Sequence, residues 1–414
     1  MKTKHKFILI ISIAVLAGAL LLTSCSPLGC ATPISRGWPG GTLDNGTLFV
    51  ASMNGKIIAV NPATNTVIGS SPQLTTTASG GILSCSASSS PLTFYTTPIV
   101  SDITDPVTGV LTQMVYVGGW KNGVIYAYTL KGAVWSTAPE YIYPRQGNGT
   151  GDIVGNITIA NNNIYFATSD GTVYALTAND LTLEWSKKID TKIWSAPAVD
   201  GTTLYIGCFN KTLYALNTAD GTEKWHYQTA GAINSTPVVY ANTVFVGDYD
   251  CDFYALDAAT GIFQWKFPAD AAAPVTPKDF FWAEPVVVNG VIYAPNLDGH
   301  VYALDTTTGK LVKDISLGDS ISSAPVVIGN KIVVATSVAS YATSKQKVNI
   351  YIIDTSDNSI SIPIALPLHE GVNAPLFADG NIVYIHTYKD NLYTINTAAP
   401  QTQPTLLFDL NTLK

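Results

Sequence analysis

The densest group of candidate metal ligands is the segment Asp248-Tyr249-Asp250-Cys251-Asp252, whose alternating carboxylates match the beginning of a calcium-binding loop. Counted from Asp248, the sixth residue of such a loop is glycine and the twelfth is glutamate. Phe253 and Ala259 occupy those positions here, and neither suits calcium. Because aspartate is also typical of tight turns, we interpret the segment as a turn and predict no metal site.

The other candidates for chemistry do not form a constellation. His226, His300, His369 and His386 are scattered without ligand spacing, and the chain contains no GxSxG, HExxH or phosphate-loop motif. We interpret the histidines as ordinary strand or turn residues. The sequence therefore indicates no catalytic residue and no cofactor, and the protein is predicted not to be an enzyme.

The first 24 residues have the organisation of an export signal. Lysines at positions 2, 4 and 6 precede an apolar run, residues 7–22, that is short for a membrane-spanning helix. The run ends in Leu22-Thr23-Ser24-Cys25, which resembles the lipobox of bacterial lipoproteins, where the cysteine is lipidated and becomes the first residue. We predict a signal peptide over residues 1–24 and lipidation of Cys25, with an ordinary signal peptide or signal anchor as the alternative.

The mature chain is acidic. Loss of the three lysines leaves 19 basic and 29 acidic residues, a formal charge of −10, which argues against nucleic acid as a partner. Ser26 follows the lipidated cysteine, and the lipoprotein resemblance then implies release to the outer membrane of a two-membrane bacterium. In a host with one membrane, the lipid would hold the protein on the outer face of the cytoplasmic membrane.

The candidate ligands and histidines described above lie within a sequence repeat. In the middle of the chain this repeat has a period of 40 residues. The segments 163–185, 203–225 and 243–265 align without a gap, and a fixed period indicates a repeat architecture. Each copy contains short runs of β-branched and aromatic residues separated by turns such as Asp200-Gly201. This pattern predicts a four-stranded antiparallel meander, with strands A to D in chain order.

Eight copies of the meander can be placed. One position of strand C recurs as Ile58 and as tyrosine at 126, 174, 214, 254, 302, 351 and 393. One meander cannot bury both faces of its sheet, so the copies must stack. With no convincing helical segment, the pattern predicts an all-β fold, an eight-bladed β-propeller over residues 41–414 that follows a linker at 25–40. A solenoid and a seven-bladed ring are the alternatives.

Four cysteines remain after Cys25, and an exported chain of this kind permits two disulfides. Cys208 and Cys251 lie near the turn between strands B and C of consecutive repeats, which favours their pairing and leaves Cys30 with Cys85 by elimination. Buried free thiols are the alternative, and the sequence leaves both open.

The segment Tyr254 to Trp265, YALDAATGIFQW, resembles the repeat of pyrroloquinoline quinone (PQQ)-type propellers, approximately YALDxxTGxxxW, and so does Tyr214 to Trp225. The resemblance covers nearly the whole mature chain. In that family the tryptophan packs between blades over the Thr-Gly turn of a neighbour. The resemblance therefore implies structural, blade-docking roles for Trp135, Trp185, Trp225, Trp265, Gly221, Gly261 and Gly309.

This resemblance specifies a fold more than a function, because the same repeat builds quinoprotein dehydrogenases and the non-enzymatic, BamB-like lipoproteins of β-barrel assembly. The dehydrogenases carry adjacent cysteines and hold Ca²⁺ with Glu, Asn and Asp beside the quinone. Here no cysteines are adjacent, and Glu284 is the one acidic residue well placed on a predicted strand A. A lone carboxylate is more often a local hydrogen-bonding group than a ligand, so we expect no bound quinone.

Four insertions distinguish the repeats: residues 70–95, 136–151, 268–281 and 338–348. Strands B and D run parallel in a meander, so D–A and B–C loops emerge on one face, and all four insertions are expected on one rim. Exposed aromatics with an arginine are typical of interface anchors, which makes this rim the predicted binding face. Packing on the propeller's own shoulder is the alternative. The rim residues are Phe94, Tyr95, Tyr141, Tyr143, Arg145, Phe280, Phe281, Trp282 and Tyr341.

Together these features predict a lipid-anchored, exported propeller that is monomeric within a complex and acts as a non-catalytic scaffold. The expected partners are proteins bound through the D–A and B–C loop face, in envelope or outer-membrane protein assembly or at the cell surface. The membrane is contacted through the N-terminal lipid alone. A surface lipoprotein that binds glycan or another ligand is the alternative, and a PQQ-dependent dehydrogenase is the third hypothesis.

Overall fold

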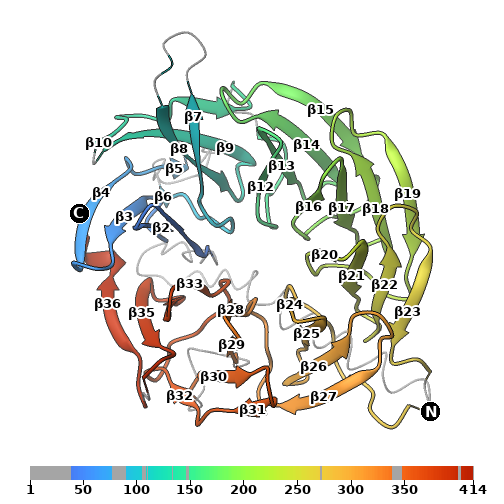
Figure 1. Ribbon diagram of the computed structural model, residues 1–414. Coiled ribbons are helices and arrows are strands. Elements are labelled where there is room, and N and C mark those ends of the chain that lie inside the picture. The colour runs from blue at the N-terminus through green and yellow to red at the C-terminus, as the bar shows by residue number, and fades with distance from the viewer. Residues whose placement is uncertain are drawn as a thin grey trace, which may run out of the picture.

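Eight antiparallel sheets are arranged in a ring in the computed structural model, as Figure 1 shows. This arrangement confirms the predicted all-β, eight-bladed propeller. The structure describes residues 39–76, 90–104, 109, 111–132, 134–145, 149–270, 273–337, 347–399 and 402–413. The predicted signal peptide, Cys25, Cys30, Cys85 and Tyr341 lie outside the described residues.

Each blade takes its strands from one continuous stretch of chain, with strand A innermost and strand D outermost (Figure 1). The strands of blades 1 to 4 are β1 (Gly41–Asp44), β2 (Thr47–Ala51), β3 (Ile57–Asn61) and β4 (Thr66–Ser70); β7 (Ile99–Thr104), β8 (Leu111–Gly119), β9 (Val124–Lys131), β10 (Val134–Trp135) and β11 (Tyr141–Tyr143); β12 (Thr158–Ala160), β13 (Asn163–Ala167), β14 (Thr172–Thr177) and β15 (Leu183–Lys188); β16 (Ala198–Asp200), β17 (Thr203–Gly207), β18 (Thr212–Asn217) and β19 (Glu223–Gln228).

Blades 5 to 8 follow the same plan. Their strands are β20 (Val238–Tyr240), β21 (Thr243–Gly247), β22 (Phe253–Asp257) and β23 (Phe263–Phe267); β24 (Val286–Val288), β25 (Val291–Pro295), β26 (His300–Asp305) and β27 (Leu311–Ser316); β28 (Val326–Ile328), β29 (Lys331–Ala335), β30 (Asn349–Asp354), β31 (Ser359–Ile360) and β32 (Ile364–Ala365); β33 (Phe377–Asp379), β34 (Ile382–His386), β35 (Asn391–Asn396) and β36 (Thr405–Asp409). A short pair, β5 (Thr75–Thr76) and β6 (Ser90–Pro91), and a 3₁₀ turn, η1 (Leu410–Thr412), complete the described elements. No helix in the described part of the chain is long and apolar enough to cross a membrane.

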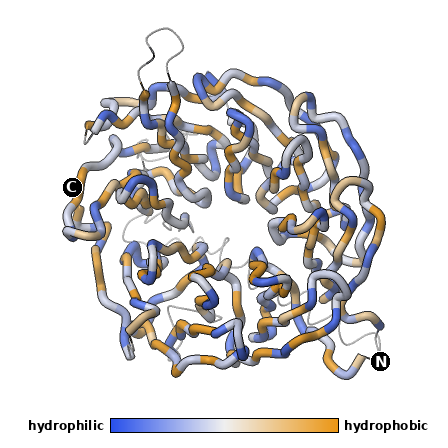
Figure 2. The backbone as a smooth tube through the Cα atoms, in the orientation of Figure 1, coloured by the Kyte–Doolittle hydropathy of each residue, from blue (hydrophilic) through white to orange (hydrophobic). Residues whose placement is uncertain are grey.

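Strands B and C are apolar on both faces because each blade is covered by a neighbour on either side. In β17, Leu204 and Ile206 pack in the layer shared with blade 3, whereas Tyr205 packs in the layer shared with blade 5. The outer strand β19 borders solvent and carries exposed Glu223 and Lys224. Figure 2 shows hydrophobic residues recurring in every blade between more hydrophilic loops. The core is therefore a set of layers between blades, and burial of these faces drives the ring to close.

Tryptophans of the outermost strand D pack against the next blade along the chain in blades 3, 4 and 5. A Cβ added to Gly221 would lie 2.5 Å from Cε3 of Trp185 in the preceding blade. The Trp185 indole Nε1 donates a hydrogen bond of 2.9 Å to the Thr218 carbonyl of the same neighbouring turn. Gly221 has a φ of +69°, so glycine is required there both for the turn and for the close approach of the ring. The same contact joins Trp225 to Gly261 and Trp265 to Gly309.

Trp135 packs in the opposite direction, which corrects its predicted role over the turn of a neighbour. Its ring lies edge-on to Phe49 of blade 1, with centroids 6.1 Å apart, and to Tyr128 of its own blade. The turn of blade 3 has Leu181, not glycine, at the left-handed position, so an indole cannot approach it closely. The Tyr116 hydroxyl still donates to the Ala178 carbonyl of that turn, at 2.7 Å, as Tyr205 does to Ala258 two blades further on.

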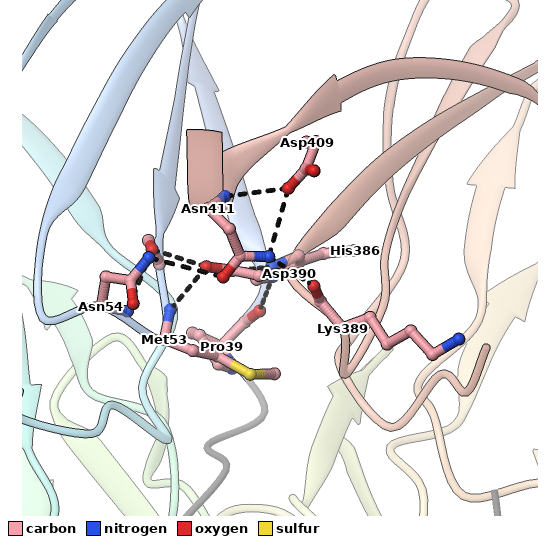
Figure 3. A network of polar contacts seen from close by, with 9 residues as sticks. Pro39, Met53, Asn54, His386, Lys389, Asp390, Asp409 and Asn411 are labelled. Carbon is pink, nitrogen blue, oxygen red and sulfur yellow. Dashed lines mark hydrogen bonds and ion pairs between the residues drawn. The ribbon is translucent and has the colours of Figure 1, made fainter. Parts of the chain in front are cut away.

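Blade 8 meets blade 1 through a buried polar network that closes the ring (Figure 3). Asp390 accepts hydrogen bonds from the Ser52 hydroxyl at 2.6 Å and the Met53 amide at 3.1 Å, both in blade 1. Its other oxygen lies 2.8 Å from Nε2 of His386, and Nδ1 of His386 lies 2.8 Å from the Pro39 carbonyl. His386 is a strand residue of β34, as predicted, but it also joins the two ends of the ring, which the sequence did not predict.

Cys208 and Cys251 are free thiols, so the favoured pairing of the two is wrong. The alternative of a buried free thiol holds for Cys208, whereas Cys251 is partly exposed. Cys208 is buried in the layer between blades 3 and 4, on the face of blade 4 that points away from blade 5. Cys251 occupies a left-handed turn position, with a φ of +68°. Burial, and then the charge of Asp279 in the segment leading into blade 6, raises the pKa of its thiol to about 12. The two side chains therefore face different layers of the ring.

Candidate binding site at the channel mouth

Five aromatic side chains from blades 4, 5 and 6 form a continuous series on the face where the D–A and B–C loops emerge. We call this set, Trp194, Phe209, Tyr249, Phe280 and Trp282, the aromatic arc. Ring centroids are 4.8 Å apart for Trp194 and Phe209 and 5.9 Å apart for Phe209 and Tyr249. Tyr249 stacks on Phe280 at 4.5 Å and on Trp282 at 6.2 Å. All five are partly exposed, so the arc presents ring edges and faces to solvent.

The arc is held by the segments that lead into strand A. The Ser195 hydroxyl donates to the Gly207 carbonyl at 2.8 Å and accepts from the Gly207 amide at 3.1 Å. Ser235 makes the same pair of hydrogen bonds with Gly247. Residues alternate along these extended segments, so the residue before each serine points into the channel. For blade 4 this residue is Trp194.

Phe94 and Phe281 are buried core residues and do not belong to a binding rim, which corrects the prediction for both. Each is 1% exposed. They stand at a position that four other blades fill with buried isoleucine, Ile153, Ile193, Ile233 and Ile321, and that blade 8 fills with buried Val372. Phe281 lies so close to Gly247 that a Cβ on this glycine would meet the Phe281 Cβ at 2.1 Å. Their burial could have been predicted from the sequence by aligning them with these isoleucines.

Tyr141 and Tyr143 also differ from the predicted rim. They belong to β11, which pairs with β9 as an outer strand of blade 2. Tyr143 packs edge-on against Phe166 and Tyr174 of blade 3. For these two residues the alternative, packing on the propeller itself, is correct.

The other rim residues within the described chain remain accessible. Arg145 is exposed, and Tyr95 is partly exposed. Tyr95 packs against Trp120 with centroids 4.6 Å apart, and the Lys121 ammonium lies 4.9 Å from the Trp120 centroid. Trp120 and Lys121 belong to the B–C turn of blade 2, which sequence reasoning did not assign to the site.

A cavity of about 120 Å³ opens between the strand-A segments at the centre of the ring. Its aromatic wall consists of Tyr95, Trp194 and Trp282, and its polar groups include Asn234 and Glu284. The Asn234 amide oxygen is buried and has no hydrogen-bond partner among the described residues. This cavity is the channel mouth, and the aromatic arc continues from its wall to the loop face.

Glu284 is a partly buried carboxyl that forms no hydrogen bond or ion pair with any described residue. Burial raises its pKa from the ordinary value of 4.5 to about 7. The preceding residue in this blade is Ala283, so blade 6 lacks the hydroxyl that Ser195 and Ser235 supply. The expected role of Glu284 as a local hydrogen-bonding group is therefore not seen.

The segment 248–252 is a turn, as interpreted from sequence. Asp248 is buried and accepts hydrogen bonds from the backbone amides of Gly231, Asp250 and Asp252 at 2.7 to 3.0 Å. Desolvation dominates these contacts and raises the pKa of Asp248 to about 6. The Asp252 carboxylate pairs with Lys266 at 2.8 Å. Within the described residues, no group of three or more His, Cys, Asp or Glu side chains is arranged to hold a metal ion.

The channel mouth does not fit a quinone cofactor of the PQQ type. Such a quinone carries several carboxylates and needs cationic or metal partners. Among the described residues, those that line the cavity include no lysine or arginine, and Glu284 is their single carboxyl. An anionic quinone and an ionised Glu284 would repel each other at this short range.

A family model described as outer membrane protein assembly factor BamB matches residues 170–402, more than half of the 414-residue chain. The chain belongs to this family. No curated protein matches it. The family match begins within blade 3 and ends within blade 8, so it includes every residue of the aromatic arc.

Two solved structures show the same fold. The computationally designed Ika8 protein has a TM-score of 0.65 and 13% identity, with 87% of this chain and 96% of that chain covered. BamB from Moraxella catarrhalis has a TM-score of 0.50 and 15% identity, with 73% and 89% covered. At these identities the likeness concerns the fold alone.

Proposed function

We propose that this protein is a lipid-anchored, non-catalytic propeller that binds protein partners during outer-membrane protein assembly. The observation that carries the proposal is the aromatic arc, which is partly exposed on the loop face of a chain belonging to the BamB family. Partly exposed aromatic side chains are the residue type that most often anchors protein interfaces. The lipobox at Leu22 to Cys25 supports export and anchoring at the cell envelope.

Two features favour a binding surface over an internal packing feature. The arc spans three blades, so its contacts cross two blade boundaries and present one surface. The segment that carries Phe280 is tied down, since Lys278 donates to Asp298 at 2.8 Å and the Leu297 amide donates to the Phe280 carbonyl at 3.0 Å. A surface fixed in advance loses little conformational entropy on binding.

Site-specific photo-crosslinking in native envelopes tests the proposal. A photoreactive phenylalanine at Phe280 samples the loop face, and the same residue at Tyr240, which is 41% exposed in the A–B region of blade 5, samples the opposite face. We expect adducts with components of the barrel-assembly machinery from position 280 and none from position 240. Adducts from position 240 alone, or from neither position, would reject the loop face as the binding surface.

Glycan binding is the second candidate, because exposed faces of tryptophan and tyrosine also suit sugar rings. A glycan array distinguishes the two functions. Binding that disappears in Trp282→Ala, together with no protein adduct from position 280, would assign the arc to glycan.

A further inference from the structure

We propose that the channel mouth binds an organic cation, a guanidinium or alkylammonium group, between Glu284 and the aromatic wall formed by Tyr95, Trp194 and Trp282. In the complex, the cation would be a basic side chain of the protein partner. This part of the inference rests on the proposed function. Glu284 and the three aromatic residues lie in the segments that precede strand A in blades 2, 4 and 6.

The unsatisfied groups of the cavity are acceptors. Glu284 has no described hydrogen-bond or ion-pair partner, and the Asn234 amide oxygen is buried without a donor. Buried polar atoms are nearly always paired, so each unpaired acceptor needs an explanation. A ligand that only donates satisfies both groups, and guanidinium and ammonium groups are donors without acceptor atoms.

The aromatic wall and the size of the cavity favour the same ligand. Cations bind over the faces of tryptophan and tyrosine within about 6 Å of the ring centroid. The volume of about 120 Å³ is close to that of a cavity of roughly 150 Å³ that holds benzene, so a planar guanidinium fits with room for its stem. No cationic side chain of the described residues lines the cavity, which leaves the carboxylate available to a cation from outside.

The charge of Glu284 makes the binding pH-dependent. Burial raises the pKa of this carboxyl to about 7, and Tyr95 is the other ionisable group that lines the cavity. The segments that precede strand A in the neighbouring blades 5 and 7 contribute Thr236 and Ala324, which carry no charge. The carboxylate is mostly ionised at pH 8 and mostly protonated at pH 6, so affinity for a cation falls by about tenfold between them.

Calorimetric titration of the whole mature protein with butylguanidinium tests the site directly, with the neutral isostere butylurea as ligand control. We expect saturable binding of butylguanidinium at pH 8, none of butylurea, and a loss of at least about tenfold in Glu284→Gln. The matched control variant is Glu223→Gln, which removes an exposed carboxyl from the outer strand β19 and is expected to leave binding unchanged. Circular dichroism confirms that each variant is folded.

The outcomes separate this inference from the proposed function. If butylguanidinium suppresses the protein adduct from position 280 and Glu284→Gln weakens it, the cation belongs to the partner. If butylguanidinium binds but the adduct is unaffected, the site takes a free small cation. Absence of saturable binding at pH 8, or equal binding to Glu284→Gln, overturns the inference while a persistent adduct still supports the protein-binding function.

Discussion

Glu284 is a residue at which one blade departs from the pattern of the others. The equivalent positions are Ala196, Thr236, Ala324 and Ala374, which are uncharged. A carboxyl at this place loses hydration, and no described donor replaces the lost water. In the free protein, the charged form of this carboxyl is therefore destabilised relative to an exposed glutamate.

Glu284→Gln is expected to stabilise the unliganded protein at alkaline pH. The folded-state pKa of about 7 lies above the ordinary value of 4.5, so deprotonation costs folding free energy as pH rises from 4.5 to 7. The full shift corresponds to about 3 kcal/mol, and partial exposure to solvent reduces it to about 1–2 kcal/mol. Urea unfolding of both proteins at pH 4 and pH 8 measures this difference, which should be near zero at pH 4. A difference that is equal at both pH values would contradict the assigned cause.

Among the elements, the C–D turn is the part that positions one blade on the next. Asp257 Oδ1 accepts from the Thr260 amide at 2.8 Å and from its hydroxyl at 2.7 Å. This contact shapes the turn so that Gly261 follows in a left-handed conformation beneath the Trp225 ring. The repeat motif thus combines a turn of one blade with the tryptophan side chain that covers it from the preceding blade.

Gly221→Ala is expected to lower the free energy of unfolding by about 2–4 kcal/mol, because the new Cβ meets Trp185 at 2.5 Å and overpacking adds to the cost of the left-handed conformation. Gly201→Ala is the matched control. Gly201 has a φ of +55° in the same blade, with nothing within 4 Å of an added Cβ, so about 1 kcal/mol is expected. Equal losses in urea unfolding would show that the Trp185 contact is unimportant.

The sequence predicted the strand pattern, the number of blades and the position of Trp185 over Gly221, because these depend on a local period and on a motif. The site was only partly predicted. Tyr95 and Trp282 do line the channel mouth, and Phe280 belongs to the aromatic arc beside it. Phe94 and Phe281 face inward by simple alternation along the same segments. Trp194, Phe209 and Tyr249 were missed because they lie outside the insertions. Their proximity depends on how neighbouring blades are placed around the ring.

The whole molecule depends on one junction between its first and last blades. Among the described strands none is exchanged there, since the four strands of blade 8 and those of blade 1 come from opposite ends of the chain. An apolar layer between the two blades and the Asp390 network hold the junction. Asp390 has a φ of +64°, where the equivalent positions are Gly55, Gly123, Gly171 and Gly299.

Asp390→Gly is therefore a clean test of ring closure, because it removes the carboxylate without straining the turn. We expect a loss of about 2–4 kcal/mol in unfolding free energy, since Ser52 and His386 are left without their buried partner. Faster amide exchange at β1 and β33 should accompany it. Lys211→Gly, at the equivalent turn position of blade 4, is the control and should change stability by less than about 1 kcal/mol. Unchanged exchange at β1 would place the critical contacts elsewhere.

The blade-to-blade hydrogen bonds of the strand-D indoles run in one direction. The Trp185 and Trp225 indoles donate forward to carbonyls of Thr218 and Ala258, which hold the same place in consecutive repeats. Donor and acceptor are therefore transferable: a gene that gains or loses one copy of 40 residues still encodes matching interfaces on both sides of the change. Only the curvature of the ring and the Asp390 junction must then adapt. The fold is in this sense extensible, and its blade number is open to evolution in a way that its individual interfaces are not.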